Sequence, residues 1–188
     1  MELELNRNYF SKLGIRFDIG LSDSEIGQVE DKYGFEFPPD LRDLLQFGLP
    51  INSGFINWRN DSEDEIRGRL DWLFEGIYFD VGHNSFWLEE WGEKPTNPKD
   101  ALRIVKGHVD KAPKLIPIYS HRYIPDAPNE KGNPVFSVYQ TDIIVYGEDL
   151  GTYLQNEFAG SQERNRIFST GKAKYIDFWS KLVKFNNG

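Results

Sequence analysis

Apolar residues recur at helical spacing through most of the chain up to Val109, in segments with recognisable starts and stops. Ser22 and Glu25 match a capping box, in which the serine accepts a backbone N–H and the glutamate reaches back to the cap. Gly34 then supplies a residue that tolerates the left-handed conformation at which many helices end. Pro39 favours a first helical turn. These signals predict helices near residues 3–13, 22–34, 39–47, 62–77 and 97–109.

After Pro113 the spacing changes to short runs of β-branched and aromatic residues, which predict strands. Pro117 lies inside the first run. Because proline has no backbone N–H to donate, that strand is expected at a sheet edge or a bulge. Gln140, Thr141 and Asp142 separate the last two runs, which favours a hairpin or two adjacent strands. The predicted strands cover residues 115–119, 135–139 and 143–146, with an earlier one at residues 55–58.

Helices precede the clustered strands, and further helices follow them near residues 150–158 and 178–182. This order favours an α+β fold, in which a central mixed or antiparallel sheet is flanked by helices within a single domain. It does not match the regular alternation of a doubly wound sheet. The polar, glycine-containing stretch 159–172 is expected to be a mobile connector.

Composition and charge exclude several classes of protein. The 188 residues can bury roughly 70% of their unfolded surface, so folding requires neither a disulfide nor a metal. The absence of cysteine excludes disulfide scaffolds, thiolate zinc sites and cysteine nucleophiles. The net charge of −8 argues against general nucleic-acid binding, which needs a basic surface. No signal peptide and no apolar span of about 18 residues is found, so we expect a cytoplasmic protein without membrane partners.

Familiar catalytic motifs are missing. The sequence contains no phosphate-binding loop, dinucleotide-binding glycine motif, serine-nucleophile motif or HExxH zinc motif. Its histidines, His83, His108 and His121, are isolated from one another along the chain, and the spacing of possible ligands matches no metal-binding motif. We therefore predict no metal, no cofactor and no catalytic residue.

The densest polar stretch follows the predicted strand 115–119 and includes His121, Arg122 and Tyr123. In one interpretation these residues line a pocket. His121 then acts as a base, Arg122 holds a carboxylate or phosphate, and Asp142 pairs with either of them across adjacent strands. In the other, they satisfy backbone groups of the irregular loop 120–134, and Asp142 is an ordinary turn residue. We favour the structural interpretation, because a general base needs a partner and the sequence shows none.

Acidic side chains are distributed unevenly along the chain. Residues 161–188 carry a net charge of +4, so residues 1–160 carry −12. An aromatic anchor inside an acidic rim is a common arrangement in protein interfaces. Two acidic blocks and the tryptophans beside the second are therefore candidate partner contacts. The alternative is that the acidic blocks form an ordinary solvated surface and that both tryptophans belong to the hydrophobic core. The candidates are Asp61, Glu63, Asp64 and Glu65, and then Trp87, Glu89, Glu90 and Trp91, with Glu93 close by.

A helix that ends at Gly34 is followed by an apolar–x–apolar–proline step over residues 35–38 and by a leucine-rich helix with Leu41, Leu44 and Leu45. This combination resembles the opening signature of the SUKH superfamily, which includes Syd and the fungal Smi/Knr regulators of cell-wall synthesis. The likeness is specific over residues 26–45. In outline it implies one SUKH-like domain over 1–188, with a core over about 21–158 and a C-terminal helical extension over about 159–188.

The resemblance implies a non-catalytic protein-binding module. Many bacterial members look like immunity proteins, which block a toxin, often a nuclease with a basic cleft. We therefore expect a monomer or weak dimer that neutralises a cognate toxin through an acidic surface. Two alternatives stay open. One is a regulatory or scaffold protein of the Smi/Knr type, and the other is a small-molecule-binding protein or hydrolase with a pocket around His121.

Overall fold

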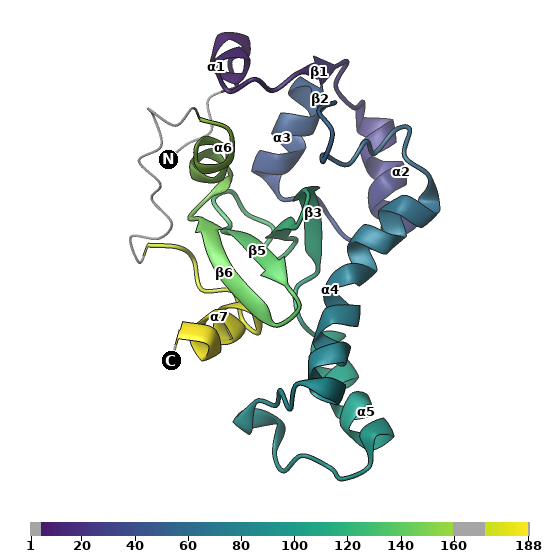
Figure 1. Cartoon of the computed structure of the whole chain (residues 1–188). Coiled ribbons are helices and arrows are strands. Elements are labelled where there is room, and N and C mark those ends of the chain that lie inside the picture. Colours follow the sequence, from purple (N-terminus) through teal and green to yellow (C-terminus); the bar gives the residue numbers. More distant parts are fainter. Residues whose placement is uncertain (1–4, 160–171, 188) are drawn as a thin grey trace.

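The computed structural model describes residues 5–159 and 172–187, and its centre is a four-stranded antiparallel sheet (Figure 1). The strands follow one another in chain order, so the sheet is a simple meander. Helices precede and follow it, which confirms the predicted α+β domain. The strands are β3 (Leu115–Tyr119), β4 (Arg122–Pro125), β5 (Val135–Tyr139) and β6 (Asp142–Gly147).

Both outer hairpins of the sheet close with two-residue turns. The structure contains the predicted β5–β6 hairpin, but Asp142, expected in the turn, begins β6 and pairs with Tyr139. Gln140 within the turn has a φ of 56°. The β3–β4 turn is built the same way, with Ser120 at a φ of 49°. β3 forms one edge of the sheet, and its register shifts between Pro117 and Tyr119. This placement confirms the expectation for a strand that carries proline.

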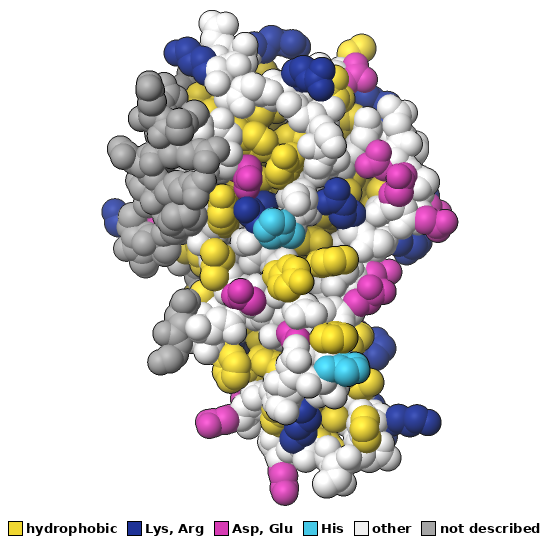
Figure 2. All heavy atoms as spheres, viewed as in Figure 1, with side chains coloured by type: hydrophobic (Ala, Val, Ile, Leu, Met, Phe, Trp, Pro, Cys, Tyr) yellow, Lys and Arg dark blue, Asp and Glu magenta, His cyan; other side chains and the backbone are white. Residues whose placement is uncertain are grey.

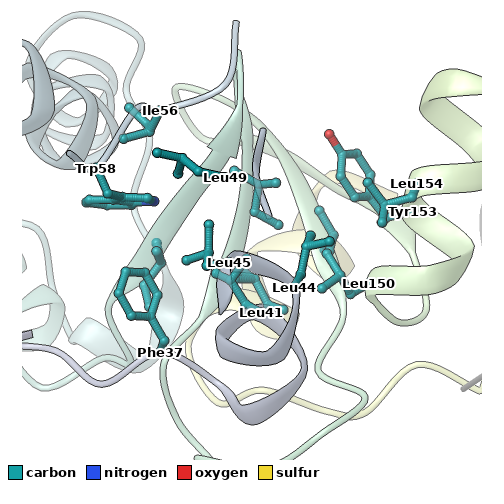
Figure 3. Close-up of a cluster of buried hydrophobic side chains, with 14 of the residues drawn as sticks. Phe37, Leu41, Leu44, Leu45, Leu49, Ile56, Trp58, Leu150, Tyr153 and Leu154 are labelled. Atoms are coloured by element: carbon teal, nitrogen blue, oxygen red, sulfur yellow. The ribbon is translucent and has the colours of Figure 1, made fainter. Parts of the chain in front are cut away.

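The two faces of the sheet bury separate hydrophobic clusters, because successive side chains of a strand point to opposite faces. The first cluster joins Ile116, Ile124 and Val135 to α3 (Pro39–Phe47) and α6 (Leu150–Phe158). Figure 3 shows Leu44 of α3 beside Leu150 of α6. The second cluster lies on the opposite face and includes Leu115, Tyr123, Phe136, Val138 and Ile143.

Helices α4 (Glu63–His83), α5 (Pro98–Val109) and α7 (Trp179–Asn187) cover the second cluster. α4 has 21 residues and is therefore about 30 Å long. It starts at a capping box of Ser62 and Glu65, at the predicted start of this helix, and carries α5 at its far end (Figure 1). α7 packs on β6, where Trp179 is fully buried and its Nε1–H donates to the carbonyl oxygen of Pro113.

The N-terminal elements lie over the first cluster. α2 begins at the Ser22–Glu25 capping box and ends at Gly34 with a φ of 69°, as predicted. The small strands β1 and β2 pair antiparallel with each other. The elements are α1 (Arg7–Lys12), β1 (Phe17–Asp18), α2 (Asp23–Tyr33) and β2 (Leu49–Pro50).

The strand predicted at residues 55–58 is wrong. Only Phe55 forms isolated bridges, and the chain then turns because the backbone N–H of Asn57 donates to Asp61 and that of Asn60 donates back to Asn57. Phe55 and Trp58 look like strand residues because both are apolar, but they lie in a loop and pack in the first cluster.

The connector predicted at 159–172 falls almost entirely on 160–171, outside the described residues. Within the described residues, no helix combines the length and the hydropathy needed to cross a membrane.

Candidate functional site

The two predicted acidic blocks lie at opposite ends of α4. Asp61, Glu63, Asp64 and Glu65 surround its first turn. Glu89 and Glu90 lie in a short 3-10 helix, η1 (Glu89–Trp91), beyond its last turn. Since α4 spans about 30 Å, the two blocks do not form one continuous acidic surface.

Most carboxylates of the first block are already engaged within the chain. Glu63 binds Lys32 at 3.0 Å and Arg67 at 2.7 Å, and the bond from Lys32 contributes most to lowering the pKa of Glu63. Glu65 accepts from Ser62 in the capping box, and Asp61 accepts the backbone N–H of Asn57. Among the described residues, only Glu63 of this block is therefore neutralised by cations, whereas Asp61 and Glu65 stabilise the start of α4 through hydrogen bonds to uncharged groups.

The tryptophans of the second block do not form an exposed anchor. Trp91 is only 5% exposed, stacks on His108 and meets Phe86 edge-on. It is a core residue of the second cluster, which corrects its assignment as a partner contact. Trp87 is half-buried, packs edge-on against Trp91 and donates its Nε1–H to the carbonyl oxygen of Gly92. Glu90 is paired with Lys181.

Arg122 lies inside the fold, where it joins three elements. Its Nε–H donates to Glu157 of α6 at 2.9 Å, and its Nη1–H donates to Ser137 of β5 at 2.8 Å. Its guanidinium also stacks over the ring of Tyr146 of β6, 3.9 Å from the centroid. The pocket interpretation, in which Asp142 could pair with Arg122, does not describe this contact, because the carboxylate that meets Arg122 comes from α6. β5 separates β4 from β6, whose backbones therefore lie about 10 Å apart.

The other candidate pocket residues face different surroundings. Tyr123 points into the second cluster and donates its hydroxyl to the carbonyl oxygen of Arg69, and burial raises the pKa of Tyr123 to about 12. His121 is exposed in the β3–β4 turn, 3.1 Å from the hydroxyl of Ser120. Partial desolvation, followed by the charge of Arg122, lowers the pKa of His121. The structure therefore does not bring His121, Arg122, Tyr123 and Asp142 together around one reacting centre.

A different surface gathers exposed aromatic side chains along α4. Trp72 and Phe79 lie on one face of this helix, seven residues apart, and Tyr139 is the last residue of β5, just before the neighbouring β5–β6 turn. These three side chains are 49%, 46% and 63% exposed. His83 continues the same helical face, with its ring stacked on Phe79 at 4.4 Å between centroids. We call Trp72, Phe79, His83 and Tyr139 the aromatic stripe.

The scaffold under the aromatic stripe fixes its parts. At Gly76, a Cβ would lie only 2.7 Å from the Cα of Gln140, so the β5–β6 turn rests directly on the helix backbone. The turn is further held by Asp80, whose Oδ2 accepts the backbone N–H and the hydroxyl of Thr141 at 2.9 and 2.6 Å. The aromatic stripe therefore has a preorganised backbone, which lowers the entropic cost of binding.

Acidic side chains border the aromatic stripe. Asp71 and Glu75 follow α4 one turn apart, and Asp142 begins β6 beside Tyr139. All three are exposed, and none joins an ion pair among residues 5–159 and 172–187. Figure 2 shows hydrophobic and histidine side chains on the face over α4 and the end of the sheet, with both acidic and basic side chains around them. The aromatic stripe therefore has three exposed carboxylates beside it, and it consists of residues other than the candidate tryptophans Trp87 and Trp91.

Comparison with known proteins assigns no family. No protein-family model matches the chain, and no curated protein matches it. A similar solved structure is the crystal structure of an uncharacterized protein from Salmonella enterica subsp. enterica serovar typhimurium str. 14028s, with 16% identity and a TM-score of 0.42. The alignment covers 100% of this chain and 90% of that one. A likeness at this level carries no argument about function.

Proposed function

We propose that this chain is a SUKH-type protein-binding module that captures a basic protein partner with the aromatic stripe, and that this partner is a toxin which it neutralises. The observation that carries the proposal is the exposure of Trp72, Phe79 and Tyr139 together on one preorganised surface. Tryptophan, tyrosine and phenylalanine are enriched in protein interfaces relative to the rest of the surface. A toxin as the partner follows from the resemblance of residues 26–45 to the SUKH signature.

The energetics favour a partner on this surface. A half-exposed Trp or Phe leaves roughly 100 Å² of mostly apolar surface in water. At ~25 cal/mol per Å², burying that area in an interface stabilises the complex by about 2.5 kcal/mol per side chain. Three such side chains in one patch make a hot spot of the usual composition.

The charge of the chain favours a basic partner. The net charge is −8, and the acids beside the aromatic stripe, Asp71, Glu75 and Asp142, are free of ion pairs in the described part of the chain. An acidic surface attracts a basic protein over a distance and speeds its association. The basic active-site cleft of a nuclease toxin has the complementary charge.

The proposal is tested with the product of a toxin gene adjacent to the gene for this chain. We expect the purified chain to abolish the toxin's activity at equimolar concentration. Trp72→Ala should weaken binding by about 30-fold, because it removes a central aromatic contact. The matched control is Tyr175→Ala, which removes a similarly exposed ring from outside the aromatic stripe. The proposal would be contradicted if the toxin kept its full activity in the presence of a molar excess of the chain. It would also be contradicted if Trp72→Ala and Tyr175→Ala bound the toxin with equal affinity.

A further inference from the structure

A pocket of about 340 Å³ opens next to the aromatic stripe. It lies between the end of α4, the β5–β6 turn and α7, and it shares Tyr139 with the aromatic stripe. Binding sites for small ligands usually measure roughly 300–1,000 Å³. The pocket is at the lower end of that range, which suits a single side chain of a partner.

Two exposed aromatic rings form walls of the pocket. Tyr139 comes from the end of β5, and Phe185, which is 53% exposed, comes from α7. Phe185 packs edge-on against Phe86 at 5.2 Å between centroids. The next residue, Asn186, donates its side-chain N–H to the carbonyl oxygen of Thr141 and so fastens α7 to the turn. Both walls are therefore held by the fold.

Two carboxylates give the pocket its charge. Asp80 lies inside with 4% exposure, and it accepts hydrogen bonds from Asn84 and Thr141, which are uncharged. Asp142 is exposed and lines the same pocket. Neither carboxylate has an ion-pair partner among residues 5–159 and 172–187. Their negative charges are therefore not neutralised by a neighbouring cation within that part of the chain.

We propose that this pocket receives an arginine side chain of the protein partner. A cation is attracted by the faces of aromatic rings and by the two carboxylates. Arginine suits the site better than lysine, because its planar guanidinium stacks on rings, donates two parallel hydrogen bonds to a carboxylate and is more weakly hydrated. Asp142 contacts the guanidinium directly, while Asp80 acts through its charge and holds the turn that carries Tyr139. This inference rests on the proposed function and names the group that the surface recognises.

The first test uses blocked tripeptides, Gly-Arg-Gly, Gly-Lys-Gly and Gly-norleucine-Gly, titrated into the isotopically labelled full chain and followed by NMR. We expect saturable shifts with the arginine tripeptide, confined to Asn84, Thr141 and their neighbours. Asp142→Asn and Phe185→Ala should each weaken this binding about fivefold. The matched controls Asp64→Asn and Tyr175→Ala, on exposed residues outside the pocket, should leave it unchanged.

Three results would overturn the inference: no saturable shifts, equal affinity for the lysine or norleucine tripeptide, or unchanged affinity in Asp142→Asn. The second test separates the inference from the proposed function. If Asp142→Asn combined with Phe185→Ala leaves the affinity for the toxin unchanged but Trp72→Ala weakens it, the arginine pocket is wrong and the binding function stands. If the tripeptide binds as expected but no toxin is neutralised, the function is wrong and the pocket stands.

Discussion

Arg122 illustrates how a residue suited to ligand recognition is used by the fold. An arginine with an adjacent histidine at the end of a strand invites the hypothesis of a binding pocket. In the structure its guanidinium is satisfied by Glu157, Ser137 and the ring of Tyr146. The decisive carboxylate lies 35 residues away on another element. No local pattern in the sequence could identify it.

The contribution of Arg122 to stability can be measured directly. We expect Arg122→Met to lower the free energy of unfolding by about 2–4 kcal/mol, because it leaves the largely buried Glu157 without its cation. Adding Glu157→Gln should restore part of the loss, since no unpaired charge then remains. Urea unfolding of the single and double variants checks both values. His121→Ala is the control, and its exposed ring should contribute less than about 0.5 kcal/mol. A loss below that value for Arg122→Met would contradict the structural role.

At the scale of elements, local signals predicted best. Ser22, Glu25 and Gly34 specify the ends of α2 through backbone hydrogen bonds within a few residues, and the structure contains each of them. The β5–β6 hairpin likewise follows from its turn. The strand predicted at 55–58 failed, because apolar residues in a loop satisfy the same pattern as a short strand.

The candidate site was harder to predict than the fold. The sequence indicates the aromatic stripe only through helical spacing: Trp72 and Phe79 lie outside the buried face of α4, which carries Leu73 and Ile77. Spacing alone does not show whether another element of the chain covers this second apolar face of α4. Trp91 shows the opposite case: its neighbours in the sequence are acidic, yet it is buried against His108 of α5 and Phe178, which immediately precedes α7.

Glycines of α4 give a matched pair of predictions. Gly68→Ala places a Cβ in open space, so the gain in helix propensity should raise the free energy of unfolding by about 0.5–1 kcal/mol. Gly76→Ala has the same gain, but its Cβ would meet the backbone of Gln140 at 2.7 Å. We therefore expect a net loss of about 1–2 kcal/mol and displacement of the β5–β6 turn. Thermal unfolding measures both, and an equal gain for the two variants would show that the turn does not rest on α4.

At the scale of the whole molecule, charge and shape have separate effects on binding. The net charge of −8 acts over long distances, whereas the aromatic stripe acts only on contact. Electrostatic attraction mainly changes the association rate, and buried aromatic contacts mainly change the dissociation rate.

The salt dependence of toxin binding should reveal this division. Between ~0.01 M and ~1 M salt the Debye length falls from about 30 Å to about 3 Å. We expect the association rate to fall at least about tenfold over this range, because screening removes the attraction to a basic partner. Trp72→Ala should instead raise the dissociation rate at every salt concentration. Surface plasmon resonance measures both rates, and an association rate that is independent of salt would contradict a basic partner.

The position of α7 has a consequence for synthesis of the chain. The first cluster draws its buried residues from positions 10 to 159, whereas the second also needs Ile176, Phe178, Trp179 and Leu182. During translation the first face of the sheet can thus close completely, while the second has only the cover that α4 and α5 provide. Until α7 emerges from the ribosome, the part of this face around β6 stays exposed as an apolar surface, the kind of surface that chaperones bind.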